Sequence, residues 1–322
     1  MNLKSALPNA ACLPQSYAIK VDNISAISVI GEEQDSYLQG QLTCDVEQLK
    51  VKPLLNGSHC DAKGKLFSSF RLIRHNGANL LISAADAMQA SMKELQKFGV
   101  FAKVEISKAD VSFLALTGSE SETVLKQRYN ALPDSFNPVV SDKDVSIAYI
   151  SGVKDFYLVI ASDEEIEQLS SSLTIDVYTS ALWVLNEIQS GFPHLGENSI
   201  REYVPQMLNM QHLNGISFTK GCYLGQETVA RMKYLGKNKK ALFALKSKSN
   251  ATLDSLSALE KQVGENWRRG GEIISHYISD DGEVYLQAVL ANDTEEDAVL
   301  RLKDNPDIEF NLLSLPYSLE TE

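Results

Sequence analysis

The sequence predicts an α+β protein whose C-terminal end forms a separate all-β domain. Three observations lead to this fold class. Short β-branched runs alternate with amphipathic helical segments up to residue 236, whereas the later segments resemble strands only. Gly, Asn and Asp residues that favour turns separate these segments. The length of 322 residues, with 44% hydrophobic and 22% charged residues, is sufficient for more than one folded domain. We therefore divide the chain into residues 1–110, 111–236 and 237–322.

The first subdomain, residues 1–110, is predicted to begin with a strand at Ala26–Ile30 and a helix at residues 32–42. Asn56-Gly57 and Asp61–Gly64 are predicted turns on either side of His59 and Cys60. Asn76-Gly77 predicts a hairpin between strands 66–74 and 79–83. A final helix has the buried positions Met88, Met92, Leu95 and Phe98, and Ser83–Asp86 is its predicted capping box.

The second subdomain, residues 111–236, is predicted to repeat the strand–helix alternation. Its expected strands are 111–117, 145–150 and 156–160, and its expected helices are 120–129 and 164–173. The all-β domain has expected strands at 241–245, 271–279, 283–290 and 308–313, with a turn at Asp280-Asp281-Gly282.

Composition excludes several classes of protein. The longest apolar runs are much shorter than the roughly 18 residues that span a bilayer, so we expect no membrane segment. Pro8 and Asn9 interrupt the N-terminus before a signal-peptide core can form, which predicts a cytoplasmic location. The four cysteines are scattered, with no spacing typical of a metal site or a disulfide framework. We predict no metal.

The charge is distributed unevenly along the chain. The net charge of −12 argues against nucleic-acid contact over most of the surface. The run from Lys220 to Lys240, however, has six Lys or Arg residues against Glu227 alone. This run is a predicted site for an anion.

The segment Thr179–Ser190, which ends at Gly191 and Pro193, is a predicted helix. Trp183 lies opposite the apolar stripe of this helix, on the same face as Asn186 and Glu187. Two interpretations remain open. Trp183 packs against a neighbouring domain, or it is a stacking platform for a flat heterocycle.

The segment from Gly215 to Arg231 has the highest density of candidate functional residues. Gly221 and Gly225 permit tight turns around Cys222, and Gln226 is a predicted helix start. A helix N-terminus and the adjacent Lys220 would favour the thiolate form that a reactive cysteine needs. A buried structural cysteine in a glycine-rich turn is the alternative.

Two further segments carry charge beside aromatic or thiol groups. His59 and Cys60 are adjacent on a predicted strand and therefore point to opposite faces, which disfavours a catalytic Cys–His pair. Lys63 and Lys65 follow them and are suited to an anion. Trp267 precedes Arg268-Arg269, which is consistent with a cation–π contact or RNA binding, although a core Trp with solvated Arg neighbours is the simpler interpretation.

Five segments together resemble the bacterial YgfZ family, described as folate-binding, tRNA-modifying proteins. The resemblance extends from about Ala18 to the C-terminus. It is carried by 37-YLQGQLT-43, 59-HCDAKGK-65, 220-KGCYLGQE-227 with 229-VAR-231, 264-GENWRR-269 and 315-LPYSL-319.

The resemblance implies a fold similar to the T-protein of the glycine cleavage system, an aminomethyltransferase. That fold has ferredoxin-like α+β domains around a central channel and a C-terminal antiparallel β-barrel. The implied cofactor is tetrahydrofolate or its 5-formyl or 5,10-methylene form. Trp183 matches one aromatic folate-binding position of the family, and Ile24 occupies the other, where it cannot supply aromatic stacking.

The resemblance also implies functional residues around the family's signature loop, which comprises Lys220, Gly221, Cys222, Tyr223, Gly225, Gln226 and Glu227. Cys222 is the candidate reactive thiol. Arg231, Lys233 and Lys237 are candidate contacts for the carboxylates of folate.

The function implied first is that of a folate-dependent accessory protein without turnover of its own. It would support iron–sulfur enzymes that modify tRNA, or the machinery that assembles them, with a link to the regulation of the replication initiator. One alternative is a folate-dependent one-carbon (aminomethyl) transferase, with Asp61 and Glu227 as candidate acid–base groups. Another is direct binding of tRNA through Lys233–Lys240 and Arg268-Arg269. We expect a monomer.

Overall fold

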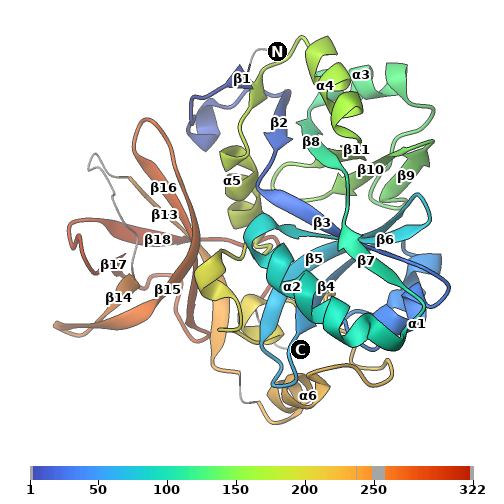
Figure 1. Cartoon of the computed structure of the whole chain (residues 1–322). Coiled ribbons are helices and arrows are strands. Elements are labelled where there is room, and N and C mark those ends of the chain that lie inside the picture. Colours follow the sequence, from blue (N-terminus) through green and yellow to red (C-terminus); the bar gives the residue numbers. More distant parts are fainter. Residues whose placement is uncertain (1–2, 237, 249–257, 320–322) are drawn as a thin grey trace.

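The structure, a computed structural model, describes residues 3–236, 238–248 and 258–319 and contains three β-sheets (Figure 1). The first is a five-stranded sheet in the order β4-β5-β6-β3-β7. Its strands are β3 (Ile24–Ile30), β4 (Leu54–Cys60), β5 (Leu66–His75), β6 (Ala78–Ala84) and β7 (Glu105–Lys108). Helices α1 (Gln34–Gln39) and α2 (Ala85–Phe98) bury Leu38, Met88 and Leu95 in one apolar cluster with this sheet.

The second sheet has seven strands in the order β1-β12-β2-β8-β11-β10-β9. These are β1 (Leu3–Lys4), β2 (Tyr17–Val21), β8 (Ser112–Thr117), β9 (Val139–Asp142), β10 (Val145–Ile150), β11 (Phe156–Ala161) and β12 (Val177–Tyr178). Helices α3 (Ser119–Arg128) and α4 (Asp163–Ser172) pack Leu125 and Ile166 against it. The structure differs from the expected division at residue 110, because β1 and β2 pair within the second sheet.

The third sheet is a closed barrel in the order β13-β16-β15-β14-β17-β18. The strand pattern predicted an all-β segment here, and the family resemblance implied the barrel. Its strands are β13 (Lys240–Lys248), β14 (Ala258–Val263), β15 (Asn266–Ile278), β16 (Glu283–Ala291), β17 (Leu300–Leu302) and β18 (Glu309–Leu313). Leu245, Leu286 and Phe310 are among the residues that form its apolar core.

Helical segments connect the second sheet to the barrel. Helix α5 (Ala181–Ser190) packs against β2, β15 and β16, so both of its faces are covered. Helix α6 (Gln226–Tyr234) lies apart from α5, at the bottom of Figure 1. The short 3-10 helices are η1 (Ala10–Cys12), η2 (Val46–Lys50), η3 (Gly99–Phe101), η4 (Glu197–Ser199) and η5 (Pro205–Leu208).

Three predicted turns are present. The turn Asp61–Gly64 is closed by the Gly64 amide, which donates to the Asp61 carbonyl at 2.9 Å. Asn76 and Gly77 have φ values of 48° and 81°, as the hairpin between β5 and β6 requires. Gly282, with φ of 84°, ends the turn between β15 and β16. No helix in the described ranges is long and apolar enough to cross a membrane.

Three local predictions are wrong. Phe98, expected on the buried face of α2, is 42% exposed. Asn56-Gly57 lies inside β4 rather than in a turn, and a Cβ atom on Gly57 would lie 2.6 Å from the Phe70 ring. This glycine therefore permits close packing. The predicted capping box of α2 is also absent, because the N-cap is Ala84 and Ser83 Oγ donates to the Ala84 carbonyl.

Candidate functional site

The turn Asp61–Gly64 packs directly against the loop that precedes α6. Gly64 and Gly225 have φ values of +75° and +83°. A Cβ atom on Gly225 would lie 2.5 Å from the Asp61 carbonyl oxygen and 2.9 Å from the Gly64 Cα atom. A Cβ atom on Gly64 would lie 2.8 Å from Cβ of Thr228 in α6. Both positions therefore require glycine, and two segments far apart in the sequence meet through their backbones.

The segment that begins at Gly40 completes this junction. The amide of Leu224 donates to the Gly40 carbonyl at 3.0 Å. The ammonium of Lys220 donates to the carbonyl oxygens of Leu42 at 2.9 Å and Cys44 at 2.8 Å. Burial lowers the pKa of Lys220 to about 8. Three of the five motif segments identified in the sequence thus meet at one place.

Cys222 lies on the exposed side of this junction, between Lys220 and Gly225, the N-cap of α6. The sequence predicted that the Lys220 ammonium supports a Cys222 thiolate. In the structure this ammonium is hydrogen-bonded to the two carbonyls described above and lies 5.1 Å from the centre of the buried Tyr223 ring. Cys222 is therefore accessible from outside on a loop that is anchored at both ends.

The cations of α6 are exposed and have local partners. Arg231 forms an ion pair with Glu227 at 2.6 Å, and both side chains are largely exposed. The ammonium of Lys233 lies 3.9 Å from the centre of the Phe218 ring. Gln226 is half-buried and Gly221 has open space around it. Lys237 lies outside the described residues.

His59, Cys60 and Asp61 are all buried next to this junction. Burial lowers the pKa of His59 to about 3 and raises that of the Cys60 thiol. The two carboxylate oxygens of Asp61 accept hydrogen bonds from the Lys63 and Lys65 amides and from Arg201. A carboxylate with these partners is held in place and is poorly suited to accept a proton from a substrate.

In the hairpin between β14 and β15, Trp267 forms its cation–π contact with an arginine other than the adjacent Arg268 or Arg269. The guanidinium carbon of Arg301 lies 3.8 Å from the centre of the Trp267 ring. Arg269 instead forms an ion pair with Glu272 at 2.5 Å, while Arg268 is exposed. The residue that stacks on Trp267 comes from β17, which the local sequence could not reveal.

A buried polar cluster joins the first sheet, α5 and the barrel. Arg71 Nη1 lies 2.8 Å from Glu187 Oε1, and His194 Nδ1 is bonded to the second oxygen of Glu187. Gln287 of β16 donates to the carbonyls of Glu187 and Phe192. The positive partners outweigh the desolvation of Glu187 and hold its pKa below the usual range. Sequence reasoning did not identify this cluster, although Glu187 in a mostly apolar helix was a signal.

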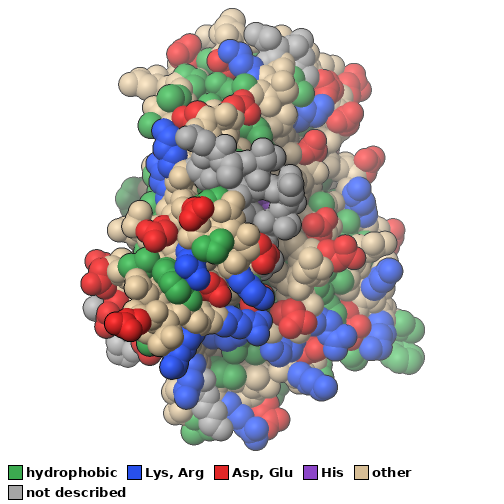
Figure 2. All heavy atoms as spheres, turned by 90° about the vertical axis from the view of Figure 1, so that its left-hand side faces the viewer, with side chains coloured by type: hydrophobic (Ala, Val, Ile, Leu, Met, Phe, Trp, Pro, Cys, Tyr) green, Lys and Arg blue, Asp and Glu red, His purple; other side chains and the backbone are tan. Residues whose placement is uncertain are grey.

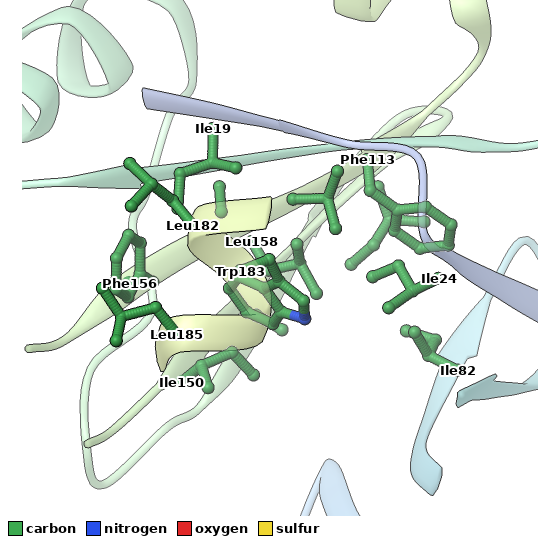
Figure 3. Packing of buried hydrophobic residues seen from close by; sticks show 14 of the residues in the cluster. Ile19, Ile24, Ile82, Phe113, Ile150, Phe156, Leu158, Leu182, Trp183 and Leu185 are labelled. Atoms are coloured by element: carbon green, nitrogen blue, oxygen red, sulfur yellow. The ribbon is translucent and has the colours of Figure 1, made fainter. Parts of the chain in front are cut away.

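Trp183 is fully buried beside this cluster (Figure 3). Its ring meets Phe156 edge-on at 5.8 Å, and the Arg71 guanidinium carbon lies 5.7 Å from its centre. Ile24 belongs to the same apolar cluster and is also buried. The indole nitrogen points towards the side where Ile24 and Phe113 lie, and it has no hydrogen-bond partner among the described residues.

The family model described as YgfZ, beta-barrel domain, matches residues 238–305. The tRNA-modifying protein YgfZ of Colwellia psychrerythraea is 48% identical over 317 residues, which cover 98% of both chains. The chain belongs to the YgfZ family. A second member, the tRNA-modifying protein YgfZ of Aliivibrio fischeri strain MJ11, is 39% identical over 96% of this chain and 95% of its own. The family expected from the five motif segments is thereby confirmed.

The fold expected for the YgfZ family is also confirmed. The crystal structure of glycine cleavage system aminomethyltransferase T from Bartonella henselae matches with a TM-score of 0.71 and covers 94% of this chain and 86% of its own. At 16% sequence identity this likeness concerns the fold alone.

One feature of the surroundings of Trp183 favours the folate binding expected from the YgfZ resemblance, and another disfavours it. The unpaired indole N–H is a donor that a pterin could satisfy. The indole is 0% exposed, however, and a cavity of about 80 Å³ beside α5, lined by residues such as Tyr17, Leu182 and Asn186, is too small for folate. Folate binding at Trp183 thus requires the packed side chains to move.

Arg231 and Lys233 do not share a site with Trp183 and Ile24, because α6 lies at the lower edge of the molecule and α5 lies near its middle (Figure 1). Among the residues that the structure describes, no group of three or more His, Cys, Asp or Glu side chains could hold a metal ion. The candidate functional site is therefore the junction around Cys222, with the Trp183 cluster as a separate candidate.

Proposed function

We propose that the chain is a folate-binding accessory protein for tRNA modification, without turnover of its own. Its partners would be iron–sulfur enzymes that modify tRNA or the machinery that assembles their clusters. The observation that carries the proposal is the exposed Cys222 on a loop anchored by three motif segments. The part of the proposal that concerns tRNA modification comes from the family members, which are named tRNA-modifying proteins.

The accessory role is favoured over a one-carbon transferase because neither candidate acid–base group is suitably arranged. Asp61 has both oxygens occupied by hydrogen bonds. Glu227 is exposed and paired with Arg231. Proton transfer to or from a reacting nitrogen requires a free group within hydrogen-bonding reach of the folate. Both groups belong to the Cys222 junction and not to the Trp183 cluster.

The proposed cofactor is tetrahydrofolate or its 5-formyl or 5,10-methylene form, and the last two would supply a one-carbon unit. Trp183 and Ile24 would contact the pterin, and the indole N–H would donate to it. The residues of the chain would orient the ring and exclude water from it.

Calorimetric titration with tetrahydrofolate and 5-formyltetrahydrofolate tests the cofactor. We expect saturable binding that weakens at least tenfold, about 1.4 kcal/mol, in Trp183→Leu and less in Trp183→Phe. Trp267→Leu, which removes the tryptophan of the barrel hairpin, is the matched control and should bind normally. Thermal unfolding of each variant establishes that it is folded. Equal affinity of the wild type and Trp183→Leu would exclude the proposed pterin contact.

Complementation of a strain lacking the gene tests the role of Cys222. Cys222→Ser should lower the content of tRNA nucleosides that iron–sulfur enzymes produce. Cys12→Ser alters another exposed cysteine and should leave that content unchanged. Full modification of tRNA in the Cys222→Ser strain would contradict the proposal.

A further inference from the structure

Lys and Arg side chains gather on one end of this acidic protein. Figure 2 shows them as a band across the lower half of the face on which the barrel lies, towards the end that carries α6. Exposed cations of the described chain at this end include Lys63, Arg201, Arg231 and Lys233. A chain with a net charge of −12 thus keeps a positive surface beside the Cys222 loop.

We propose that this surface binds RNA directly, with α6 as its centre. Tyr234 is 68% exposed at the C-terminal end of α6, and Leu235 beside it is 58% exposed. The ammonium of Lys233 lies near two rings, 3.9 Å from the centre of Phe218 and 5.7 Å from that of Tyr234. An exposed aromatic ring beside cations is the arrangement with which proteins stack unpaired bases and hold the adjoining phosphates.

The cations around α6 are available to phosphates. The Arg231–Glu227 pair joins two side chains that are 64% and 77% exposed, and such pairs contribute little to stability. A phosphate can therefore take the place of Glu227 at low cost. Lys63 lies on the turn that packs against the first turn of α6, and its side chain is exposed.

Arg201 extends the same surface from another segment. Its guanidinium is anchored to Asp61 of that turn at 3.1 Å, and 57% of its side chain remains exposed. An arginine that is held on one side by a carboxylate and open on the other is well placed to hold a phosphate. The surface thus combines cations from α6, from the turn before β5 and from the segment that follows η4.

RNA with unpaired bases fits these features better than an acidic protein does. An acidic partner would use the cations but would have no need of an exposed Tyr234 ring. The membership of the chain in a family of tRNA-modifying proteins makes tRNA, with its unpaired loop bases, the natural RNA to test. RNA binding at α6 and folate binding at Trp183 involve different residues, and either can fail without the other.

Fluorescence anisotropy with a labelled, unmodified tRNA transcript tests the surface on the full-length protein. Arg231→Gln/Lys233→Gln should weaken binding at least tenfold and reduce the slope of log K against log salt by about 1.5, as two lost phosphate contacts require. Tyr234→Ala should weaken binding about tenfold, whereas Tyr234→Phe should bind like the wild type.

The matched control is Lys126→Gln/Lys97→Gln. Lys126 forms an i,i+4 pair with Glu122, as Arg231 does with Glu227, and Lys97 lies 4.9 Å from the Phe98 ring, as Lys233 lies near Phe218. This variant should bind tRNA normally. Equal weakening by the control, or no saturable binding of tRNA, would overturn the proposal. Displacement of tRNA by poly-glutamate together with an unaltered affinity of Tyr234→Ala would also overturn it, in favour of an acidic protein partner.

Discussion

Gly225→Ala is the most direct perturbation of the junction between the signature loop and the turn at Asp61–Gly64. The residue has φ of +83°, which costs a side chain with a Cβ atom about 1–2 kcal/mol. The new methyl group would also lie 2.5 Å from the Asp61 carbonyl oxygen and 2.9 Å from the Gly64 Cα atom. Both contacts are with backbone atoms, which cannot move aside by a rotamer change, and overpacking of this kind costs about 1–3 kcal/mol more. We therefore expect a loss of about 2–5 kcal/mol.

Urea unfolding of the wild type and three glycine variants measures this loss. Gly221→Ala lies in the same loop, where an added Cβ atom would have no neighbour within 4 Å, and should change stability by less than about 0.5 kcal/mol. Gly236 has φ of +56°, and an added Cβ atom there would have no neighbour within 4 Å. Gly236→Ala should therefore lose only the free energy that the left-handed backbone conformation costs a residue with a Cβ atom. The difference between Gly225→Ala and Gly236→Ala isolates the contact with the turn.

The rate at which a thiol reagent modifies Cys222 provides a second readout for Gly225→Ala. It is measured in a Cys12→Ser background, because Cys12 is the other exposed cysteine. We expect the rate to change in Gly225→Ala and to stay the same in Gly236→Ala. If Gly225→Ala is as mild as Gly221→Ala in both measurements, the backbone junction does not anchor the loop.

Three further predictions concern groups that are buried or half-buried. Burial lowers the pKa of His59 to about 3, so below about pH 6.5 the unfolded chain binds a proton that the folded chain does not. The free energy of unfolding should therefore decrease as the pH is lowered, by about 2 kcal/mol at pH 5 relative to the His59→Asn variant. Urea unfolding at several pH values measures this, and an equal pH dependence of the two proteins would contradict it. Arg71→Leu should lower the free energy of unfolding by about 3–5 kcal/mol, because it leaves the buried Glu187 carboxylate without the Arg71 guanidinium. The double variant Arg71→Leu/Glu187→Leu should recover much of this loss, as a double-mutant cycle would measure. Tyr317→Phe removes the hydrogen bond that the hydroxyl donates to the Gly191 carbonyl and should lower the thermal stability by about 1 kcal/mol, whereas Tyr234→Phe should not.

Local patterns predicted most elements of the fold. The hairpin at Asn76-Gly77 and four of the six barrel strands follow from turn residues and β-branched runs, which act over a few positions. Strands β14 and β17 were not predicted. Gly57 was assigned to a turn because sequence alone does not distinguish a glycine needed for φ from one needed for packing. Its neighbour is the Phe70 ring on the next strand.

The candidate site could be predicted only in part, because its residues come together through tertiary contacts. Cys222 and its glycines were identified from spacing. The anchoring of Lys220 by the Leu42 and Cys44 carbonyls depends on a segment far away in the sequence. The burial of Trp183 follows from the position of α5 between the second sheet and the barrel, which no periodicity within the helix encodes.

The pairing of β2 with β8 and β12 has a consequence for the order of folding during synthesis. The strands of the five-stranded sheet lie between Ile24 and Lys108, so this sheet can form as soon as that segment leaves the ribosome. Tyr17–Val21, by contrast, is made first and reaches its parallel partner only after Val177–Tyr178 has been synthesised. Strand β2 therefore joins its sheet only after the segment that forms the five-stranded sheet has been synthesised. A substitution in β2 should accordingly impair the folding of the second sheet first.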